Sequence, residues 1–570
     1  MSTAHTKTSK NFLIAAGGTG MRCLQSFLNM CAMGMYSGES VDILLLETDI
    51  ENGDKKNSEN LYNWYKTLTT GNGKGEYFGP HINFYTFVPD YSKDNQRRFT
   101  LISRLESGDA HVNRMLSDLF YEEGVQEFDL MHGFRAQTHV GSYLMYHAFI
   151  EEIRAAVSSD VIRNKSQLYQ FINSIKTQNT NGEARIFVLG STFGGTGASS
   201  IPVMARAISD AAKVISGGMI QMENMYFGAV ILTPYFSFKS PSKEHKKAEK
   251  VIADSQFFAH NSAAALMYYI KDNTILSTYK RFYMMGWPFK SLDMDKYKAM
   301  ISGDNSGKTI TGGKSQENPA HPVELMGAFA AEHFFNTTEK NVLKEIYSTE
   351  VKFKAIEYEA KGEEKSAYLH FDDLIDGEYN AKEGDSAGKS GDEKGSKQKY
   401  ADLAGWNITG MYYLNLLTQQ VYGGDFGGML RNLSRYNYDY TFNQEELEAM
   451  NKYAQYFTYL KDEKNVKPGW LPQMYYSMDK PTNGELFSYV GEALDVLGTG
   501  GDPHRNKLFT KGKNKEMTTK GRPSLVQEAE MFMKAWTKVN KPVKKGTKKD
   551  FFIDFRKTIN TFSRVIHKSA

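Results

Sequence analysis

Two glycine-rich stretches are the residues best suited to chemistry in this sequence. The first is Gly17-Gly18-Thr19-Gly20, and the second is Gly194-Gly195-Thr196-Gly197; each follows an apolar run and precedes a helix-like one. Glycine has no side chain and accepts positive φ, so such a loop can aim several backbone N–H groups at one point. A helix that begins there adds free N–H groups and the positive end of its dipole. We therefore predict an anion site, most simply for phosphate, with a tight strand-to-helix turn as the alternative for each loop.

The elements around these loops are expected to alternate between strand and helix. Apolar runs predict strands at 12–16, 41–49, 81–89, 225–236 and 280–289, and another that begins at Phe187 and leads into the second glycine loop. Helical patterns follow several of them, and NPAHPVELMGAFAAEHFF reads as a buried helix with proline at its first position. Such alternation predicts a parallel sheet covered by helices on both faces, which binds ligands at the carboxyl ends of its strands. Both glycine loops lie at that edge.

The order and spacing of these motifs resemble the tubulin/FtsZ superfamily. FVLGSTFGGTGASSIPVMARAIS is similar to the signature loop and helix, LIAAGGTG to the first phosphate loop, and ILLLETD to the second strand and its acid. GAVILTPYFSF resembles the strand and loop that lead to the base and ribose. GFRAQTHVG, from Gly133 to Gly141, resembles the third phosphate-side loop of divergent bacterial tubulin-like proteins. The resemblance covers about residues 10–345.

This resemblance implies an α/β fold with a parallel-sheet nucleotide-binding domain of tubulin/FtsZ type and a helix-rich C-terminal region. It implies GTP or GDP with Mg²⁺, Asp49 near the metal or its waters, and Arg135 able to pair with phosphate oxygens. The residues that it places at the nucleotide are Gly17, Gly18, Thr19, Gly20, Asp49, Arg135, Gly141, Ser191, Gly194, Gly195, Thr196, Gly197 and Asn318. Asn318 and Glu324 flank the helix start where the superfamily recognises the base; a helix cap and a solvated face are the plainer explanations of the two.

Hydrolysis in the superfamily uses acids that one subunit supplies to the nucleotide of its neighbour. The candidate here is FDDLID, residues 371–376, with Phe371 in place of the family's Asn and with Asp373 and Asp376 as the catalytic acids; an exposed acidic turn is the alternative. The implied activity is a GTPase that assembles head to tail.

Two other functions fit parts of the same pattern. One is a nucleotide-dependent scaffold that does not hydrolyse GTP, with the helix-rich C-terminal region docking a protein partner. The other is a nicotinamide-dependent oxidoreductase of the dinucleotide fold, with Asp49 on the ribose, but Cys23 then stands where that motif needs its third glycine, and the second loop has no role. GDNSGKT, residues 303–309, is one residue too short for a phosphate-binding P-loop.

Length and composition limit the class of protein. The chain has 570 residues, and its 41% hydrophobic content is enough to build cores. The net charge of only +3 gives no general attraction to nucleic acid or anionic membrane, so nucleic acid is not an expected partner. The two cysteines, Cys23 and Cys31, are expected to be reduced core thiols, and the absence of a long apolar run predicts a soluble cytoplasmic protein without a membrane span.

The expected domain organisation has four parts. Residues 1–345 form the GTP-binding domain, and 346–378 connect it to the rest and carry the acidic loop. Residues 379–399 are rich in Gly, Ser, Lys and Glu and are expected to be a flexible linker. Residues 400–570 are expected to be mostly helical with a basic tail.

Overall fold

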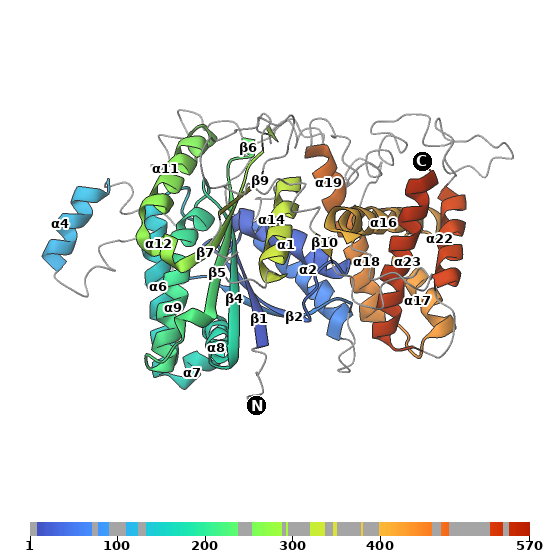
Figure 1. Ribbon diagram of the computed structural model, residues 1–570, viewed down its shortest axis with the longest axis horizontal. Helices are drawn as coiled ribbons and strands as arrows, with labels where there is room; N and C mark the ends of the chain where they lie inside the picture. Colours follow the sequence, from blue (N-terminus) through green and yellow to red (C-terminus); the bar gives the residue numbers. More distant parts are fainter. Residues whose placement is uncertain are drawn as a thin grey trace.

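A seven-stranded parallel sheet forms the centre of the protein in the computed structural model (Figure 1). The structure describes residues 8–70, 78–89, 110–122, 133–237, 253–287, 292–293, 320–336, 346–349, 378–379, 398–458, 469–477, 525–539 and 546–569. The strands are β1 (Thr8–Ala16), β2 (Ser40–Leu46), β3 (His81–Phe87), β4 (Gly182–Ser191), β5 (Met225–Leu232), β7 (Tyr279–Met285) and β9 (Ile346–Thr349). Their order is β3-β2-β1-β4-β5-β7-β9, and every neighbouring pair is parallel. The predicted parallel α/β sheet is confirmed, and β9 carries it just past residue 345.

Helices cover both faces of the sheet. On one face lie α1 (Gly17–Ala32), α2 (Gly53–Thr70) and α14 (Pro322–Asn336); on the other lie α6 (Thr138–Ser158), α8 (Gln167–Asn181), α9 (Thr196–Ser216), α11 (Phe258–Lys271) and α12 (Asn273–Thr278). Successive strand residues point to opposite faces, so Leu13 joins the core under α1 while Phe12 and Ile14 join the core under α6 and α9. Burial on both faces explains why the strands read as continuous apolar runs.

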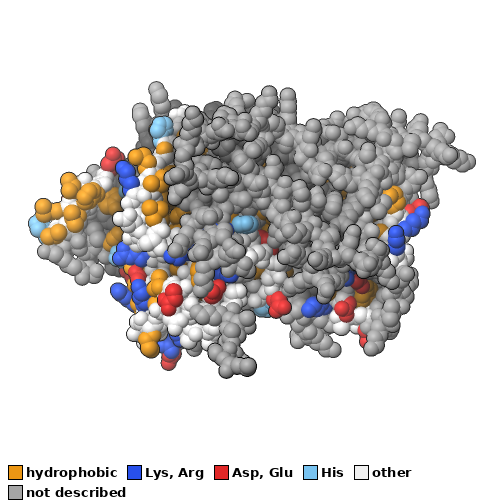
Figure 2. Space-filling model, viewed as in Figure 1, with side chains coloured by type: hydrophobic (Ala, Val, Ile, Leu, Met, Phe, Trp, Pro, Cys, Tyr) orange, Lys and Arg blue, Asp and Glu red, His pale blue; other side chains and the backbone are white. Residues whose placement is uncertain are grey.

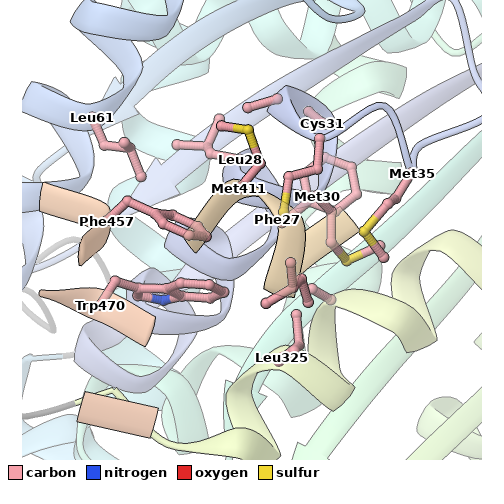
Figure 3. Packing of buried hydrophobic residues seen from close by; sticks show 14 of the residues in the cluster. Phe27, Leu28, Met30, Cys31, Met35, Leu61, Leu325, Met411, Phe457 and Trp470 are labelled. Carbon is pink, nitrogen blue, oxygen red and sulfur yellow. The ribbon is translucent and has the colours of Figure 1, made fainter. Parts of the chain in front are cut away.

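The C-terminal region is a group of helices that packs on the α1 and α2 side of the sheet. It contains α16 (Tyr400–Val421), α17 (Phe426–Asn437), α18 (Gln444–Thr458), α19 (Trp470–Ser477), α22 (Leu525–Val539) and α23 (Lys548–Ser569). Its core is continuous with that of the sheet: Figure 3 shows Met411, Phe457 and Trp470 beside Phe27 and Leu28 of α1. The described part of this region is therefore helical, as predicted, and it shares one hydrophobic core with the sheet domain.

Polar contacts reinforce this junction. The hydroxyl of Tyr453 on α18 donates to Asn29 Oδ1 at 2.7 Å, and that of Tyr456 donates to Gln25 Oε1 at 3.0 Å. The described part of the expected basic tail, which begins at Gly546, packs on the rest of the region: Lys548 at the start of α23 is buried and pairs with Glu446 at 2.6 Å.

Several sequence-based expectations fall outside the described residues. These are Asn318, the acids Asp373 and Asp376, and the tract 380–397; the short strands β10 (Glu378–Tyr379) and β11 (Gln398–Lys399) pair on either side of that tract. Cys23 and Cys31 are buried free thiols, as predicted. None of the helices in the described part of the chain is long and apolar enough to cross a membrane.

Candidate functional site

The two glycine loops meet where β1 and β4 lie side by side. Helix α1, which follows β1, lies on one face of the sheet, and α9, which follows β4, lies on the other, so the two carboxyl ends form the kind of edge at which open α/β sheets bind ligands. Gly17 has φ +70°, and a Cβ there would lie 2.8 Å from the backbone N of Gly197. A Cβ on Gly197 would lie 2.9 Å from the carbonyl oxygen of Ala16. The first and second loops thus touch through their backbones, which requires glycine at both positions.

The remaining glycines of the loops divide into two kinds. A Cβ on Gly20 would overlap the carbonyl oxygen of Leu189, so this glycine lets α1 pack closely on β4. Gly194 has only the Ser191 hydroxyl nearby, 3.2 Å from its Cβ position, and it is partly exposed, as are Gly18 and Gly195. Backbone is therefore accessible at Gly18 and at Gly194–Gly195, on either side of the contact between the loops.

A third loop completes this edge of the sheet. Residues 133–136 turn tightly, with positive φ at Gly133 (71°), Arg135 (45°) and Ala136 (65°). A Cβ on Gly195 would lie 3.2 Å from Arg135 N and 3.3 Å from Ala136 N, so this loop lies against the second glycine loop. Two residues other than glycine with positive φ are an uncommon, strained arrangement that the surrounding packing must hold.

Three helices begin at these loops with open N-termini. None of α1, α6 and α9 has a side-chain cap or an acid in its first turn, whereas Ser166, Asp272 and Asp425 cap α8, α12 and α17. Missing caps also occur at α7 (Asp160–Lys165) and α11, so the distinctive feature is that three such ends lie together. Their N–H groups and dipoles create positive potential at one place, which favours an anion.

The acid that contacts the second loop is Glu47, directly after β2. Its Oε1 accepts hydrogen bonds from Thr196 Oγ1 at 2.8 Å and from Thr48 N at 2.7 Å, and its Oε2 accepts from Asn52 Nδ2 at 3.2 Å. Burial raises the pKa of Glu47, although the hydrogen bond from Thr196 acts in the opposite direction. Asp49, the acid that the sequence favours, instead accepts a hydrogen bond from Glu51 N at 3.0 Å in the turn that leads to α2.

A buried ion cluster lies one turn along α1 from the first loop. Arg22 donates from Nε to Glu324 at 2.6 Å, from Nη1 to Asp54 at 3.1 Å, and from Nη2 to the hydroxyls of Tyr235 at 2.7 Å and Thr19 at 3.4 Å. The Tyr235 hydroxyl in turn donates to Glu324. Glu324 is completely buried, so the expectation that it lies on a solvated face is wrong. Burial raises the pKa of Asp54 to about 7, although the charge of Arg22 acts against this rise.

His321 extends the cluster at the start of α14. Its Nδ1 accepts a hydrogen bond from Val323 N at 3.2 Å, and its ring lies 4.8 Å from that of Tyr235 and 4.7 Å from that of Trp287 between ring centroids. Burial lowers the pKa of His321 to about 3, so this imidazole is neutral at physiological pH. Its contacts are those of a structural side chain.

The structure brings together most of the residues expected at the nucleotide. Gly17, Gly18, Thr19, Gly20, Arg135, Ser191, Gly194, Gly195, Thr196 and Gly197 lie at the three loops, and Gly141 packs on Ser199 of α9 in the first turn of α6. Within the described part of the chain, no three His, Cys, Asp or Glu side chains form a group that could hold a metal ion by themselves. Mg²⁺ commonly needs only one or two protein ligands when phosphate oxygens and water supply the others.

Comparison of the sequence with protein-family models and with curated proteins finds no match to either. The geometry of the site and the order of the motifs therefore carry the argument for function. The strand order β3-β2-β1-β4-β5 is common to several nucleotide-binding folds, including the dinucleotide fold, so the choice among them depends on the loops.

Proposed function

We propose that this edge of the sheet binds the phosphates of a nucleoside triphosphate, GTP with Mg²⁺, in a domain of tubulin/FtsZ type. The observation that carries the proposal is the meeting of three open helix N-termini at loops whose backbone is accessible at Gly18 and at Gly194–Gly195. Phosphate oxygens are well matched to such N–H groups, because the donors are fixed in place and carry no competing side chain.

The side chains around the loops fit an anionic ligand and its metal. Arg135, partly exposed in the third loop, adds a cation at the rim. Glu47, held by Thr196, is the acid at the second loop and would orient a water bound to Mg²⁺. When bound, the metal would neutralise charge on the phosphate oxygens. Arg22 does not serve as a phosphate ligand in this arrangement, because Glu324, Asp54 and Tyr235 already engage its guanidinium.

Hydrolysis is proposed to need a neighbouring subunit. Neither glycine loop carries a base, and Glu47 already accepts several hydrogen bonds, so a second molecule would supply the group that orients water; Asp373 and Asp376 are the candidates. Phosphate release per molecule should then rise with protein concentration as head-to-tail contacts form. A protein that binds GTP but releases no phosphate at any concentration would instead be a cytoplasmic nucleotide-dependent scaffold, with the C-terminal helices available to a protein partner.

The nicotinamide-dependent reading is less well supported. In the dinucleotide alternative Asp49 would bind the ribose hydroxyls, but here this side chain is buried and its Oδ1 accepts a hydrogen bond from Glu51 N. The third-glycine position holds Cys23, which is buried against α14, 3.1 Å from the Cβ position of Gly327. The proposal therefore favours a triphosphate.

A substitution pair at Gly194 tests the proposal. Gly194→Ala adds a methyl group that meets only the hydroxyl of Ser191, so it should fold and bind GTP almost as the native chain does. Gly194→Asp adds a carboxylate at the same accessible place, and we expect it to lower GTP affinity at least about tenfold, since like charges would then share the site. Titration calorimetry with GTP, GDP, ATP and NADH measures this, with melting temperature as the check on folding.

The two variants distinguish the effect of an added charge at Gly194 from the effect of an added side chain. Loss of binding in Gly194→Asp but not in Gly194→Ala supports phosphate at the second loop. Equal GTP affinity in both folded variants would refute that placement, and preferential binding of NADH would favour the dinucleotide reading.

A further inference from the structure

An amphipathic helix projects from the sheet domain with its apolar side facing solvent. The helix is α4 (Ala110–Phe120), which stands apart from the body in Figure 1. Val112, Met115, Leu116, Leu119 and Phe120 are 47%, 59%, 46%, 75% and 68% exposed, whereas Ser117 is buried. Five large apolar side chains at helical spacing on one exposed face are typical of a helix that binds another surface.

The helix is fixed where it meets the body. Tyr121, which follows α4, stacks on the ring of His139 at the start of α6, with centroids 5.3 Å apart and planes 9° from parallel. The exposed side of α4 is thus presented from a defined point beside the third loop.

A second apolar face lies on α11 and α12 of the same chain. Phe257, directly before α11, is 56% exposed, and Met267, Tyr268, Ile270 and Leu276 are 57%, 50%, 68% and 42% exposed. Ala263 and Ala264 are exposed on the same side of α11, and such small side chains let a second helix approach closely. Figure 2 shows orange side chains both on α4 and over this neighbouring part of the body.

We propose that two copies of this protein pair by exchanging α4, with the α4 of each copy lying on the α11–α12 face of the other. Both faces stay exposed within one chain, so α4 does not cover its own α11–α12 face. Each face has five large apolar side chains. Each also carries one cation and one acid, Arg114 and Asp118 on α4 and Lys271 and Asp272 on the other, so the two faces match in size and neither has an excess of charge.

The area supports a reciprocal pair. With on the order of 150 Å² per large side chain, these exposures leave roughly 430 Å² of apolar surface on each face. One contact between the faces would bury roughly 850 Å² in total, which is small for a stable complex, whereas the two contacts of a two-fold pair would bury roughly 1,700 Å², within the standard range.

A lipid surface is the less favoured occupant. Helices that lie on membranes are rich in Lys and Arg on their polar side, but α4 has one Arg and one Asp among its exposed residues. The pairing needs no nucleotide, so it is independent of the function proposed above.

Three variants of the full chain test the pairing, each at an exposed position so that folding is preserved. Leu119→Glu alters α4, Ile270→Glu alters the α11–α12 face, and Met219→Ser is the matched control at an apolar side chain that is 82% exposed elsewhere. Analytical ultracentrifugation without nucleotide should show a dimer for the native chain and for Met219→Ser. The dimer dissociation constant should rise at least about tenfold in either Glu variant.

A mixture of the two Glu variants then identifies the contact. Leu119→Glu retains an intact α11–α12 face and Ile270→Glu an intact α4, so the mixed pair keeps one of two contacts and should associate more tightly than either variant alone. No gain on mixing would show that α4 pairs with something other than this face, and a native chain that is monomeric at all concentrations would also overturn the proposal. So would binding to anionic phospholipid vesicles that Leu119→Glu abolishes while native and variant chains are both monomeric.

Discussion

The glycine loops and the Arg22 cluster lie at the same edge of the sheet but differ in their charged groups. The loops expose mainly backbone, whereas the cluster buries charged side chains that pair with one another. At the loops, the backbone is partly exposed at Gly18, Gly194 and Gly195, and Arg135 is the one cation among the described residues of the three loops. One turn along α1, a guanidinium and two carboxylates are buried together, and each has a partner of opposite charge. The charged side chains are thus committed to holding α1, α2 and α14 in place. In the proposed complex, the ligand's negative charge would therefore be met mainly by backbone dipoles.

The largest effect should come from removing the cation of the buried cluster. Arg22→Met leaves Asp54 and Glu324 without their positive partner, which should lower the free energy of unfolding by about 3–5 kcal/mol. The double variant Arg22→Met with Glu324→Gln should recover part of the loss, because one unpaired charge is then removed. Urea unfolding measures both. A loss below about 1 kcal/mol for Arg22→Met would show that the cluster does not hold this edge.

The next largest loss of stability is expected at one of two glycines within the loops. Gly20→Ala places a methyl group on the carbonyl oxygen of Leu189, so it should cost about 2–3 kcal/mol of stability. Gly194→Ala, the matched change at the accessible glycine, should cost less than about 1 kcal/mol. The same unfolding assay compares them, and equal costs would mean that the distinction between packing glycines and ligand-facing glycines is wrong.

The sequence predicted the glycine loops and the sheet because both depend on local patterns. Apolar runs, glycine clusters and the proline that begins α14 at Pro322 mark elements without reference to distant residues. The Arg22 cluster could not be predicted in that way, since Arg22 and Glu324 are 302 positions apart and each looks like an ordinary helix residue. The one local sign of the cluster in the sequence is Arg22 itself, a charged residue within a largely apolar helix.

Finer features of the site could not be predicted from the sequence either. Both Glu47 and Asp49 follow β2, and only the positions of the neighbouring strand ends decide which acid reaches Thr196. The positive φ of Arg135 and Ala136 could not be predicted, because neither residue is a glycine. The shared core between α1 and α18 depends on pairs such as Asn29 and Tyr453, 424 positions apart, so no local pattern predicts it.

The Arg22 cluster should make the stability of the protein depend on pH through Asp54. The pKa of Asp54 rises from 3.8 to about 7 in the folded protein, so its folded form holds a proton that the unfolded chain has released. The stabilisation that Asp54 contributes is fully present below pH 3.8 and is lost as the pH rises toward 7. Over this range the free energy of unfolding falls by about 1.4 kcal/mol per pH unit for one proton. The native chain should therefore lose stability relative to Asp54→Asn between about pH 5 and pH 7. Parallel profiles in urea unfolding would contradict this.

The smallest effect is expected at Glu47. Glu47→Gln keeps an oxygen that can accept from Thr196 and Thr48 but turns an NH₂ group toward the donor Asn52 Nδ2, so the free energy of unfolding should fall by about 1 kcal/mol. GTP affinity measured with Mg²⁺ and with a chelator should change little in either case. A loss of affinity confined to the Mg²⁺ condition would instead identify Glu47 as a direct metal ligand.

Hydrogen–deuterium exchange of the native chain with and without GTP and Mg²⁺ tests the central claim most directly, because it reports on backbone N–H groups. We predict slower exchange together in the segments around 17–20, 134–138 and 194–197, where α1, α6 and α9 begin. Amides at the capped starts of α8 and α17 should exchange as before. Saturating GTP that leaves all three loops unchanged, or protects only segments elsewhere, would contradict the placement of phosphate at this edge.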